Sequence, residues 1–268
     1  MMIHCGVVGN PVLHSLSPLI HQHFASQAKI PLGYDKIQGD NAAFESQVKD
    51  FFDRGGRGLN ITLPFKPRAF ALAAVLTERC SQAKAANTLW QHAGQLHADN
   101  TDGIGLVRDL VRYVDLNNKT ILLLGAGGAA RGVIGPLLSA GVAKVTLANR
   151  TLENARALLT DFPHITCLAM DELDESFDVI INATSASLAG EQLILPSGIW
   201  STKPLCYDLA YRLHEPTHFV NYASGQGCVA VDGLGMLVEQ AAEAFAIWHN
   251  FIPETKSVLD NLREFPTN

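Results

Sequence analysis

The sequence has no apolar run long enough to cross a membrane. Its longest apolar region, residues 120–148, is interrupted by Arg131, Lys144 and many glycines, whereas a membrane-spanning helix needs about 20 apolar residues in a row. The N-terminal stretch MMIHCGVVGNPV also lacks the basic segment and long apolar core of a secretory signal. We therefore expect a cytoplasmic protein without a membrane partner.

Clustered positive charge is absent as well. The formal net charge is −6, and no basic block or basic stretch with interleaved aromatic residues occurs. Proteins that bind nucleic acids or anionic membranes usually carry such a basic patch. The sequence therefore predicts no nucleic-acid partner.

Cysteines and histidines do not form a recognisable ligand pattern. The cysteines occur singly, at Cys5, Cys80, Cys167, Cys206 and Cys228. Without a CxxC motif or Cys/His ligand spacing, we predict reduced thiols, no disulfide framework and no metal site. His14, His21 and His23 lie close together in sequence, and we expect them to be exposed or hydrogen-bonded.

What the first third of the chain does contain is an alternation of strand and helix patterns. Strands are predicted over 3–9 and 33–37 and in LNITLP, with helices over 18–29 and 41–53 between them. In the first helix, Ser17 is expected to cap and Pro18 to fill the first helical position. Alternation of this kind predicts an α/β fold.

The second half contains a complete βαβ unit. The apolar run ILLL predicts a strand covered on both faces, and the glycine-rich segment Gly125–Ala130, a helix and the strand KVTLANR follow. Further strands are expected over 177–184, 204–211 and 228–233, and further helices over 103–114 and 235–248. We predict a substrate-binding domain (1–102 plus 235–268) and a Rossmann-type, doubly wound nucleotide-binding domain (103–234), with a cleft between them.

The glycine-rich segment is typical of a dinucleotide site. Gly125 allows the tight turn, Gly127 lets a pyrophosphate approach the backbone, and Ala130 allows close packing of helix and strand. The alternative is a glycine-rich turn that binds nothing. After the next strand, Asn149 stands where NAD enzymes carry an acidic residue, and Arg150 follows. Arginine pairs with phosphate, which favours NADP, although Arg150 could also be a solvated surface charge.

Lys66 and Asp102 are the best acid–base candidates. Lys66 lies in GLNITLPFKP, where two prolines flank Phe65 and Lys66, and we expect a rigid position at the end of a strand. Asp102 lies in the turn-rich DNTDGIG. A lysine and a carboxylate at one site can exchange a proton with a substrate hydroxyl. The alternatives are a surface lysine and an aspartate that stabilises a turn or caps a helix.

Ordered motifs along nearly the whole chain resemble the shikimate dehydrogenase family. They are GNPVLHSLSPLIHQHF, NITLPFK, AANTL, DNTDGIG, GAGGAARG, NRT, NATS, YDLAY and DGLGMLVEQAAEAF. The resemblance implies NADPH-dependent reduction of 3-dehydroshikimate to shikimate in aromatic amino-acid (chorismate) biosynthesis, by an enzyme that is a monomer or a homodimer.

The resemblance also implies residue roles. Lys66 and Asp102 would be the catalytic pair, and Ser15 and Ser17 would bind the substrate carboxylate. The ring hydroxyls would be held by Thr62, Asn87 and Gln240, with Tyr211 lining the same pocket. The cofactor would be bound by Gly125, Ala126, Gly127, Gly128, Ala129, Asn149, Arg150, Thr151, Thr184, Gly233 and Met236. Each of these residues has a structural alternative, such as a cap, a turn or plain core packing.

Two segments depart from the family pattern. Many members carry a basic residue a few positions after NRT, where this chain has Asn154, so the preference for NADP could be less strict. The loop YRLHEPT differs from a common Tyr-x-Pro pattern on the nicotinamide side. The alternatives left open are an NAD-dependent quinate/shikimate dehydrogenase or a paralogue acting on another ring acid, a folate dehydrogenase and a non-catalytic metabolite sensor.

Overall fold

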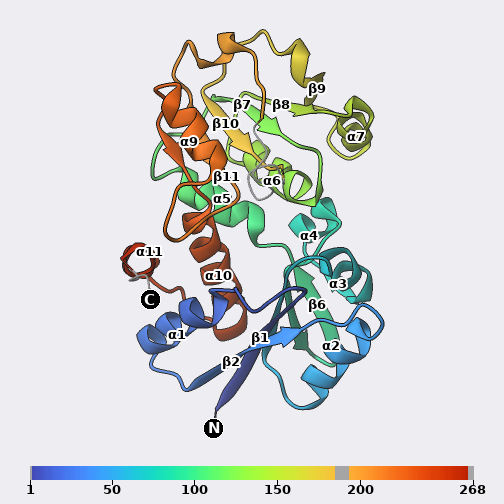
Figure 1. Cartoon of the computed structure of the whole chain (residues 1–268). Helices are drawn as coiled ribbons and strands as arrows, with labels where there is room; N and C mark the ends of the chain where they lie inside the picture. Colours follow the sequence, from blue (N-terminus) through green and yellow to red (C-terminus); the bar gives the residue numbers. More distant parts are fainter. Residues whose placement is uncertain (1, 185–192, 265–268) are drawn as a thin grey trace. The chain divides into compact units, whose positions relative to one another are not determined.

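The computed structural model describes residues 2–184 and 193–264, which form two compact units (Figure 1). Unit 1 runs to Gly105 and continues over Val238–Asn261, and unit 2 comprises Leu106–Leu237 with the described residues from Leu262 onward. Each unit contains one six-stranded sheet. The prediction of an α/β fold is therefore confirmed.

The sheet of unit 1 is mixed. Its strand order is β2-β1-β3-β5-β6-β4, with bounds β1 (Ile3–Gly9), β2 (Leu32–Gln38), β3 (Gly58–Ile61), β4 (Val75–Leu76), β5 (Thr88–His92) and β6 (Gln95–Asp99). Strand β1 runs parallel to β2 and β3, whereas β5 is antiparallel to both β3 and β6. The sequence does not predict the β5–β6 hairpin, which turns at Ala93 and Gly94 with positive φ at both residues.

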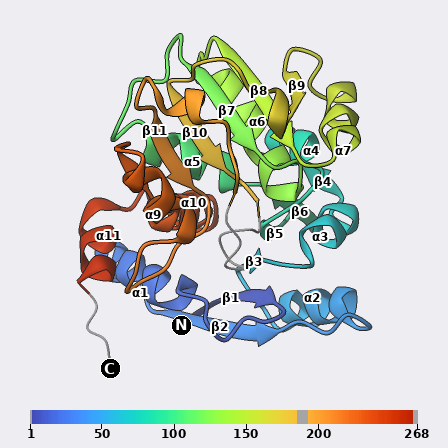
Figure 2. The same cartoon turned by 45° about the horizontal axis from the view of Figure 1, so that its top comes forward.

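Helices cover both faces of this sheet (Figure 1 and Figure 2). On one face, buried side chains of β1, β3, β5 and β6 pack against α2 (Phe44–Asp53), α3 (Lys66–Leu72) and α4 (Glu78–Ala83). On the other, α1 (Ser17–Ala28) packs against α10 (Leu234–His249) through rings such as Phe24 and Phe245. The sheet therefore presents its strand ends, rather than its faces, to a ligand.

The sheet of unit 2 is entirely parallel, with the order β12-β11-β10-β7-β8-β9. Its strands are β7 (Thr120–Leu124), β8 (Lys144–Asn149), β9 (Thr166–Ala169), β10 (Val179–Asn182), β11 (Leu205–Asp208) and β12 (Ala230–Val231). The reversal of strand order beside β7 is the doubly wound arrangement, in which ligands bind outside the carboxyl ends of the strands.

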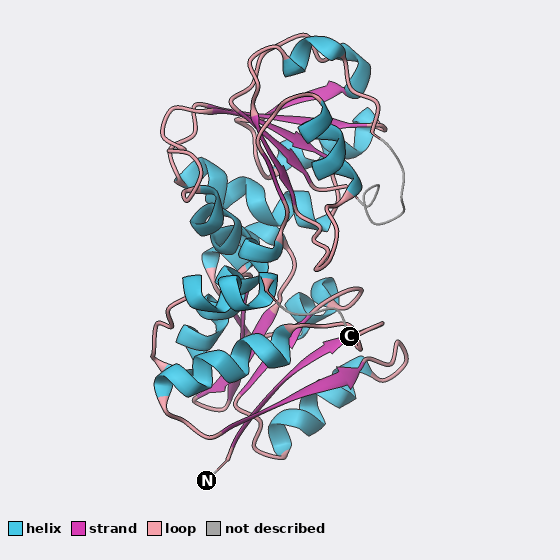
Figure 3. Ribbon diagram, turned by 60° about the vertical axis from the view of Figure 1, so that its left-hand side comes forward, coloured by secondary structure: helices cyan, strands magenta, loops and turns pink. Residues whose placement is uncertain are grey.

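Both faces of the unit 2 sheet are covered, and Figure 3 shows helices on either side of its magenta strands. Ile121 and Leu123 belong to one core cluster, and Leu122 and Leu124 to the other. This alternation confirms that ILLL is a doubly covered strand. The flanking elements are α5 (Asp102–Leu110), α6 (Gly128–Ser139), α7 (Leu152–Arg156), α9 (His218–Gly225) and the 3-10 turns η1 (Ala157–Thr160), η2 (Met170–Glu172) and η3 (Ser197–Trp200). Most of α11 (Lys256–Arg263) belongs to unit 1.

Several element ends differ from the predicted ones. Helix α5 ends at Leu110 instead of 114, because the following residues close tighter turns such as Tyr113 N to Leu110 O. Strands β11 and β12 are shorter than 204–211 and 228–233. Within the described ranges, no helix is both long enough and apolar enough to span a membrane.

Candidate active site

Lys66 begins a helix. Strand β3 ends at Ile61, a turn closes with the Phe65 amide donating to the Thr62 carbonyl (3.0 Å), and α3 starts at Lys66 with Pro67 in its first turn. The expectation that Lys66 ends a strand is therefore wrong, because a proline in the first turn supplies a helical φ and lacks an amide that would need a partner. The fully buried Phe65 ring, stacked on Phe44 at 4.7 Å, anchors the turn.

Asp102 lies within hydrogen-bonding distance of Lys66. The Lys66 Nζ donates to Asp102 Oδ2 at 2.5 Å, and the two side chains are 25% and 16% exposed. Asp102 is the first residue of α5, where a negative charge is favoured by the helix dipole. Its backbone amide donates to Asn100 Oδ1 at 3.1 Å. The pair is thus partly shielded from water and still open to a small ligand.

Asn87 joins this pair to Gln240. The Asn87 Nδ2 lies 2.8 Å from Asp102 Oδ1, 2.9 Å from Thr101 Oγ1 and 3.2 Å from Gln240 Oε1. Asn87 and Gln240 are both buried. The Asp102 carboxylate is therefore held by Lys66 on one oxygen and by Asn87 on the other. The structure brings these four predicted residues together, and their roles stay predictions.

The serine loop forms a second polar group in unit 1. The Ser15 hydroxyl donates to Ser17 Oγ at 3.1 Å and accepts from the Ser17 amide at 3.2 Å. Ser17 is not the helix cap that we expected, since the N-cap of α1 is Leu16, which makes no side-chain cap bond. Thr62 packs against Gly9, where an added Cβ would lie 2.2 Å from Thr62 Cγ2, so only glycine leaves room there.

The glycine-rich segment has the shape of an anion cradle. Gly125 has φ +101°, and an added Cβ would lie 3.0 Å from Thr184 Cγ2. At Gly127 and Gly128 an added Cβ would meet nothing within 4 Å. Because the Gly127 N-cap has no side chain, the first amides of the 12-residue helix α6 are left uncovered. Helix starts of this kind bind phosphates, and the residues therefore fit a dinucleotide.

The end of β8 offers polar groups for a further phosphate. Arg150 is exposed directly after the strand. The Asn149 Nδ2 donates to the Thr151 carbonyl at 2.8 Å and shapes the turn. Thr151 is the N-cap of α7 and makes no side-chain cap bond. A guanidinium at this position fits the 2′-phosphate of NADP, and Asn149 places no carboxylate there that would repel the phosphate.

Three other predicted residues lie in unit 2. Burial raises the pKa of Tyr211. Gly233 cannot be replaced without a shift, because an added Cβ would lie 2.3 Å from the Leu209 carbonyl oxygen. The Met236 amide donates to Tyr207 Oη at 3.3 Å, and that hydroxyl donates to the buried Asp109 at 2.7 Å. The first turn of α10, which carries Met236, is thereby fixed.

Comparison with known proteins identifies the family. Three family models match: the shikimate dehydrogenase substrate binding domain over residues 7–89, shikimate/quinate 5-dehydrogenase over 106–194 and the shikimate 5'-dehydrogenase C-terminal domain over 233–263. A protein of Legionella pneumophila (strain Lens) named shikimate dehydrogenase (NADP(+)) is 58% identical over 99% of this chain and 100% of its own. The chain belongs to the shikimate dehydrogenase family.

More distant shikimate dehydrogenases agree over the same length. A shikimate dehydrogenase (NADP(+)) of Laribacter hongkongensis is 46% identical over 96% of this chain and 97% of its own. The crystal structure of shikimate 5-dehydrogenase from Thermus thermophilus in complex with NADP(H) and shikimate is 31% identical, with a TM-score of 0.89 over 98% of this chain and 99% of that one. The resemblance inferred from the motifs is confirmed.

Within this shikimate dehydrogenase fold, four polar residues beside Asn87 escaped the sequence analysis. Their side chains lie on β2, β3, β5 and the β6–α5 turn, and they are Tyr34, Asn60, Thr88 and Thr101. One signal was present, because Asn60 interrupts the otherwise apolar strand GLNI. A buried amide in a short strand needs partners, and Tyr34 of β2 with Asn87 and Thr88 of AANTL supply them.

His21 contradicts the expectation for the three histidines. It is fully buried, with its ring stacked on Tyr34 at 4.4 Å and on Trp248 at 5.4 Å. Neither ring nitrogen makes a hydrogen bond of normal geometry to any residue that the structure describes. Burial, followed by the nearby His249, lowers its pKa to about 3. In the described part of the chain, no three His, Cys, Asp or Glu side chains could hold a metal ion.

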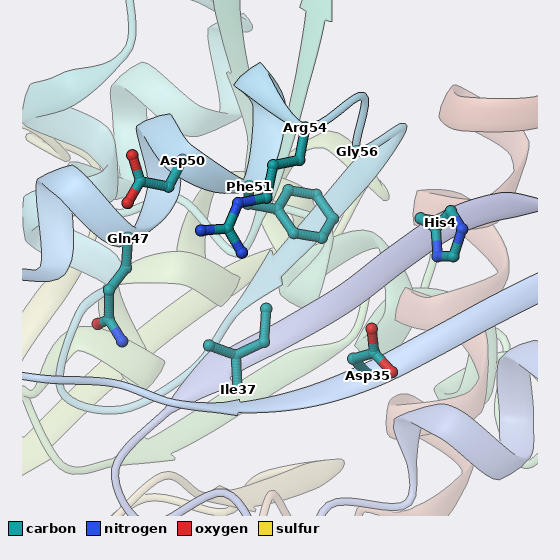
Figure 4. A pocket seen from close by; sticks show the side chains of 8 residues that line it. All are labelled: His4, Asp35, Ile37, Gln47, Asp50, Phe51, Arg54 and Gly56. Carbon is teal, nitrogen blue, oxygen red and sulfur yellow. The ribbon is translucent and has the colours of Figure 1, made fainter.

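A surface pocket of about 500 Å³ lies elsewhere on unit 1 (Figure 4). Its lining includes His4 and Asp35 of the first two strands and Asp50, Phe51 and Arg54 of α2 and the residue after it. None of the predicted site residues lines it. The exposed charges of both signs around it select no particular ligand, so the candidate site remains the cluster around Asp102.

Proposed function

We propose that this protein catalyses the reversible, NADP-dependent reduction of 3-dehydroshikimate to shikimate in the shikimate pathway. The observation that carries the proposal is the cluster of Lys66, Asp102, Asn87 and Gln240 in a chain that is 58% identical to a shikimate dehydrogenase (NADP(+)) over 99% of its length. A fold by itself does not determine a reaction, whereas this cluster supplies a proton-transfer pair with hydrogen-bonding groups for a ring hydroxyl.

Lys66 is proposed to transfer the proton. In the direction of reduction, the Lys66 Nζ gives a proton to the oxygen of the reacting carbonyl, and in oxidation it takes the proton from the hydroxyl. Asp102, 2.5 Å away, holds the ammonium in place and accepts a hydrogen bond from the substrate. Bound nicotinamide supplies or accepts the hydride. The start of α3 keeps the lysine within reach of one oxygen.

Hydroxyl and amide side chains are proposed to select the substrate. Ser15 and Ser17 would take its carboxylate, and Thr62, Asn87 and Gln240 its hydroxyls, with Tyr211 lining the pocket. A site built to pair hydroxyls rejects analogues that leave its buried polar groups unpaired. Asn87 and Gln240 are buried enough for this cost to matter.

Unit 2 is proposed to bind NADP. The backbone from Gly125 to Ala129 would hold the pyrophosphate, and Arg150, with Asn149 and Thr151, the 2′-phosphate. Thr184, Gly233 and Met236 would lie along the nicotinamide half. In this proposal residues 1–102 plus 235–268 form the substrate domain and 103–234 the cofactor domain.

The proposal also covers partners, cellular compartment and oligomeric state. Small molecules are the only proposed partners, in a cytoplasmic monomer or homodimer. Free thiols at all five cysteines support a reducing compartment. Sedimentation of the purified protein distinguishes one copy from two.

The test is consumption of NADPH with 3-dehydroshikimate, with the product identified by chromatography. Formation of shikimate in step with NADPH loss supports the proposal. A folded protein that binds NADPH and forms no shikimate would overturn it.

A further inference from the structure

A line of buried hydrogen bonds leads from β2 to the Asp102 carboxylate within unit 1. The Tyr34 hydroxyl donates to Asn60 Oδ1 at 2.7 Å, and Asn60 Nδ2 donates to Thr88 Oγ1 at 3.2 Å. The Thr88 hydroxyl donates to Asn87 Oδ1 at 2.9 Å, and Asn87 Nδ2 donates to Asp102 Oδ1 at 2.8 Å. Every bond in this series is donated toward Asp102.

Two backbone groups set the direction of the series. Asn60 Nδ2 also donates to the Asn87 carbonyl oxygen at 3.1 Å, and a carbonyl can only accept. Asn87 Oδ1 also accepts from the Thr101 amide at 2.8 Å, and an amide can only donate. Both side-chain amides are thus fixed in one orientation. The hydroxyl between them, on Thr88, has to accept from one and donate to the other.

Burial makes the series hard to replace. Tyr34, Asn60, Thr88 and Asn87 are at most 8% exposed. A buried donor or acceptor that loses its partner keeps the full cost of its desolvation, because water cannot reach it. Deleting one hydroxyl therefore disturbs the neighbouring amides as well as the bond removed.

The start of the series is held by stacked rings. The Tyr34 ring stacks on His21 of α1, and His21 stacks on Trp248 of α10. Trp248 in turn requires Gly58, where an added Cβ would lie 2.2 Å from its ring. Helices α1 and α10 also carry Ser17 and Gln240. The same packing that fixes Tyr34 therefore fixes the helices that bear two predicted substrate ligands.

We propose that Tyr34, Asn60 and Thr88 are positioning residues, which hold the Asn87 amide and through it the Asp102 carboxylate in the orientation that the reaction needs. This inference rests on the proposed function, since it deepens the assignment of the same site. None of the three needs to touch the substrate. Their effect is to limit the motion of Asn87, so that Asp102 keeps one oxygen for Lys66.

Thr88→Val is the decisive variant, because valine keeps the shape and loses the hydroxyl. We expect kcat to fall about tenfold, which corresponds to roughly 1.4 kcal/mol of transition-state stabilisation, with an unchanged KM for NADP. Thr88→Ser, which restores the hydroxyl, should recover most of the rate. Tyr34→Phe removes the first donor and should lower kcat less. If Thr88 had a purely structural role, its loss would not lower kcat while leaving the KM for NADP unchanged. Nor would Thr88→Ser and Thr88→Val differ in kcat when the two variants are equally stable.

Thr146→Val is the matched control. Thr146 is fully buried in β8, and its hydroxyl has no hydrogen-bond partner in the described structure. This variant should keep the wild-type kcat. A folded Thr88→Val protein with kcat within about twofold of wild type would overturn the inference.

A second measurement is independent of turnover. The side-chain amide protons of Asn87 should exchange slowly in wild type and in Thr88→Ser, and at least about tenfold faster in Thr88→Val. Equal exchange in Thr88→Val and wild type would overturn the inference. If the wild-type protein shows this protection and does not act on shikimate, the proposed function fails and the positioning series stands.

Discussion

Lys66 Nζ and Asp102 Oδ2 lie 2.5 Å apart, each at the first residue of a helix. A carboxylate is favoured at a helix start, whereas an ammonium is not. The position of Lys66 therefore goes against the usual electrostatic preference, and Asp102 compensates for it. Local rules are often broken at functional sites, which supports a role for this lysine in chemistry rather than in stability.

Lys66→Ala should reduce kcat about 10²- to 10⁴-fold, the usual contribution of a general acid or base. Binding of NADPH, measured by fluorescence titration, should change little, because the variant leaves unit 2 intact. Lys49→Ala is the control, since Lys49 is an exposed lysine of α2 that pairs with Asp53. Near-normal turnover in the Lys66 variant would rule out the assignment.

Gly127→Ala should separate cofactor binding from folding. The added methyl group meets nothing within 4 Å and φ is −82°, so the melting temperature should stay near that of wild type. The methyl group would instead occupy the proposed pyrophosphate site and weaken NADP binding at least about tenfold, a loss of roughly 1.4 kcal/mol. Gly198→Ala, at another glycine with open space, should bind NADP normally. Equal NADP affinity in both variants would count against the cradle.

Arg150→Ala should change the choice of cofactor. Loss of charge-assisted hydrogen bonds to a 2′-phosphate should raise the KM for NADP about 10- to 100-fold, and the KM for NAD should stay constant. Arg54→Ala removes an exposed arginine of unit 1 and serves as the control. A parallel change for NADP and NAD would show that Arg150 does not contact the phosphate.

Acid should destabilise the protein through His21. Its pKa is about 3 in the folded chain and 6.5 ordinarily. Between these values the unfolded chain binds more protons, so stability is lost as pH falls from 6.5 toward 3, by up to about 1.4 kcal/mol per pH unit. Urea unfolding of His21→Leu should show a shallower loss between pH 6.5 and 4.5.

His23→Leu, in the same helix, is the comparison variant for this experiment, because the His23 side chain is half-buried whereas the His21 side chain is fully buried. Burial also lowers the pKa of His249, to about 4, so some acid sensitivity should remain in the His21 variant. An identical pH slope in wild type and His21→Leu would contradict the account of this buried ring.

Much of unit 2 could be predicted from the sequence. The run ILLL and the spacing of Gly125, Gly127 and Ala130 are local signals, and a parallel sheet buried on both faces produces them directly. Ala130 is fully buried, as close packing of helix and strand requires. The lengths of β11 and β12 were overestimated because apolar residues follow Asp208 at the end of β11 and precede Ala230 at the start of β12.

Unit 1 was harder to predict, because its site depends on contacts distant in sequence. Lys66 and Asp102 are 36 residues apart, and Asn87 and Gln240 are 153 apart. The ordered family motifs allowed these four residues to be assigned to one site. No local sequence pattern could show that Tyr34 or Asn60 lies beside them. Two prolines flank Phe65 and Lys66, but a proline in a first turn starts a helix, and the expectation that Lys66 lies at the end of a strand was wrong.

The decisive assay follows the change in nicotinamide absorbance when the purified protein oxidises shikimate or quinate with NADP or NAD. We predict fast turnover with shikimate and NADP and little with the other three pairs. Comparable turnover with quinate or NAD would indicate the broader quinate/shikimate activity. A folded, NADP-binding protein with no turnover on any pair would contradict the proposed function.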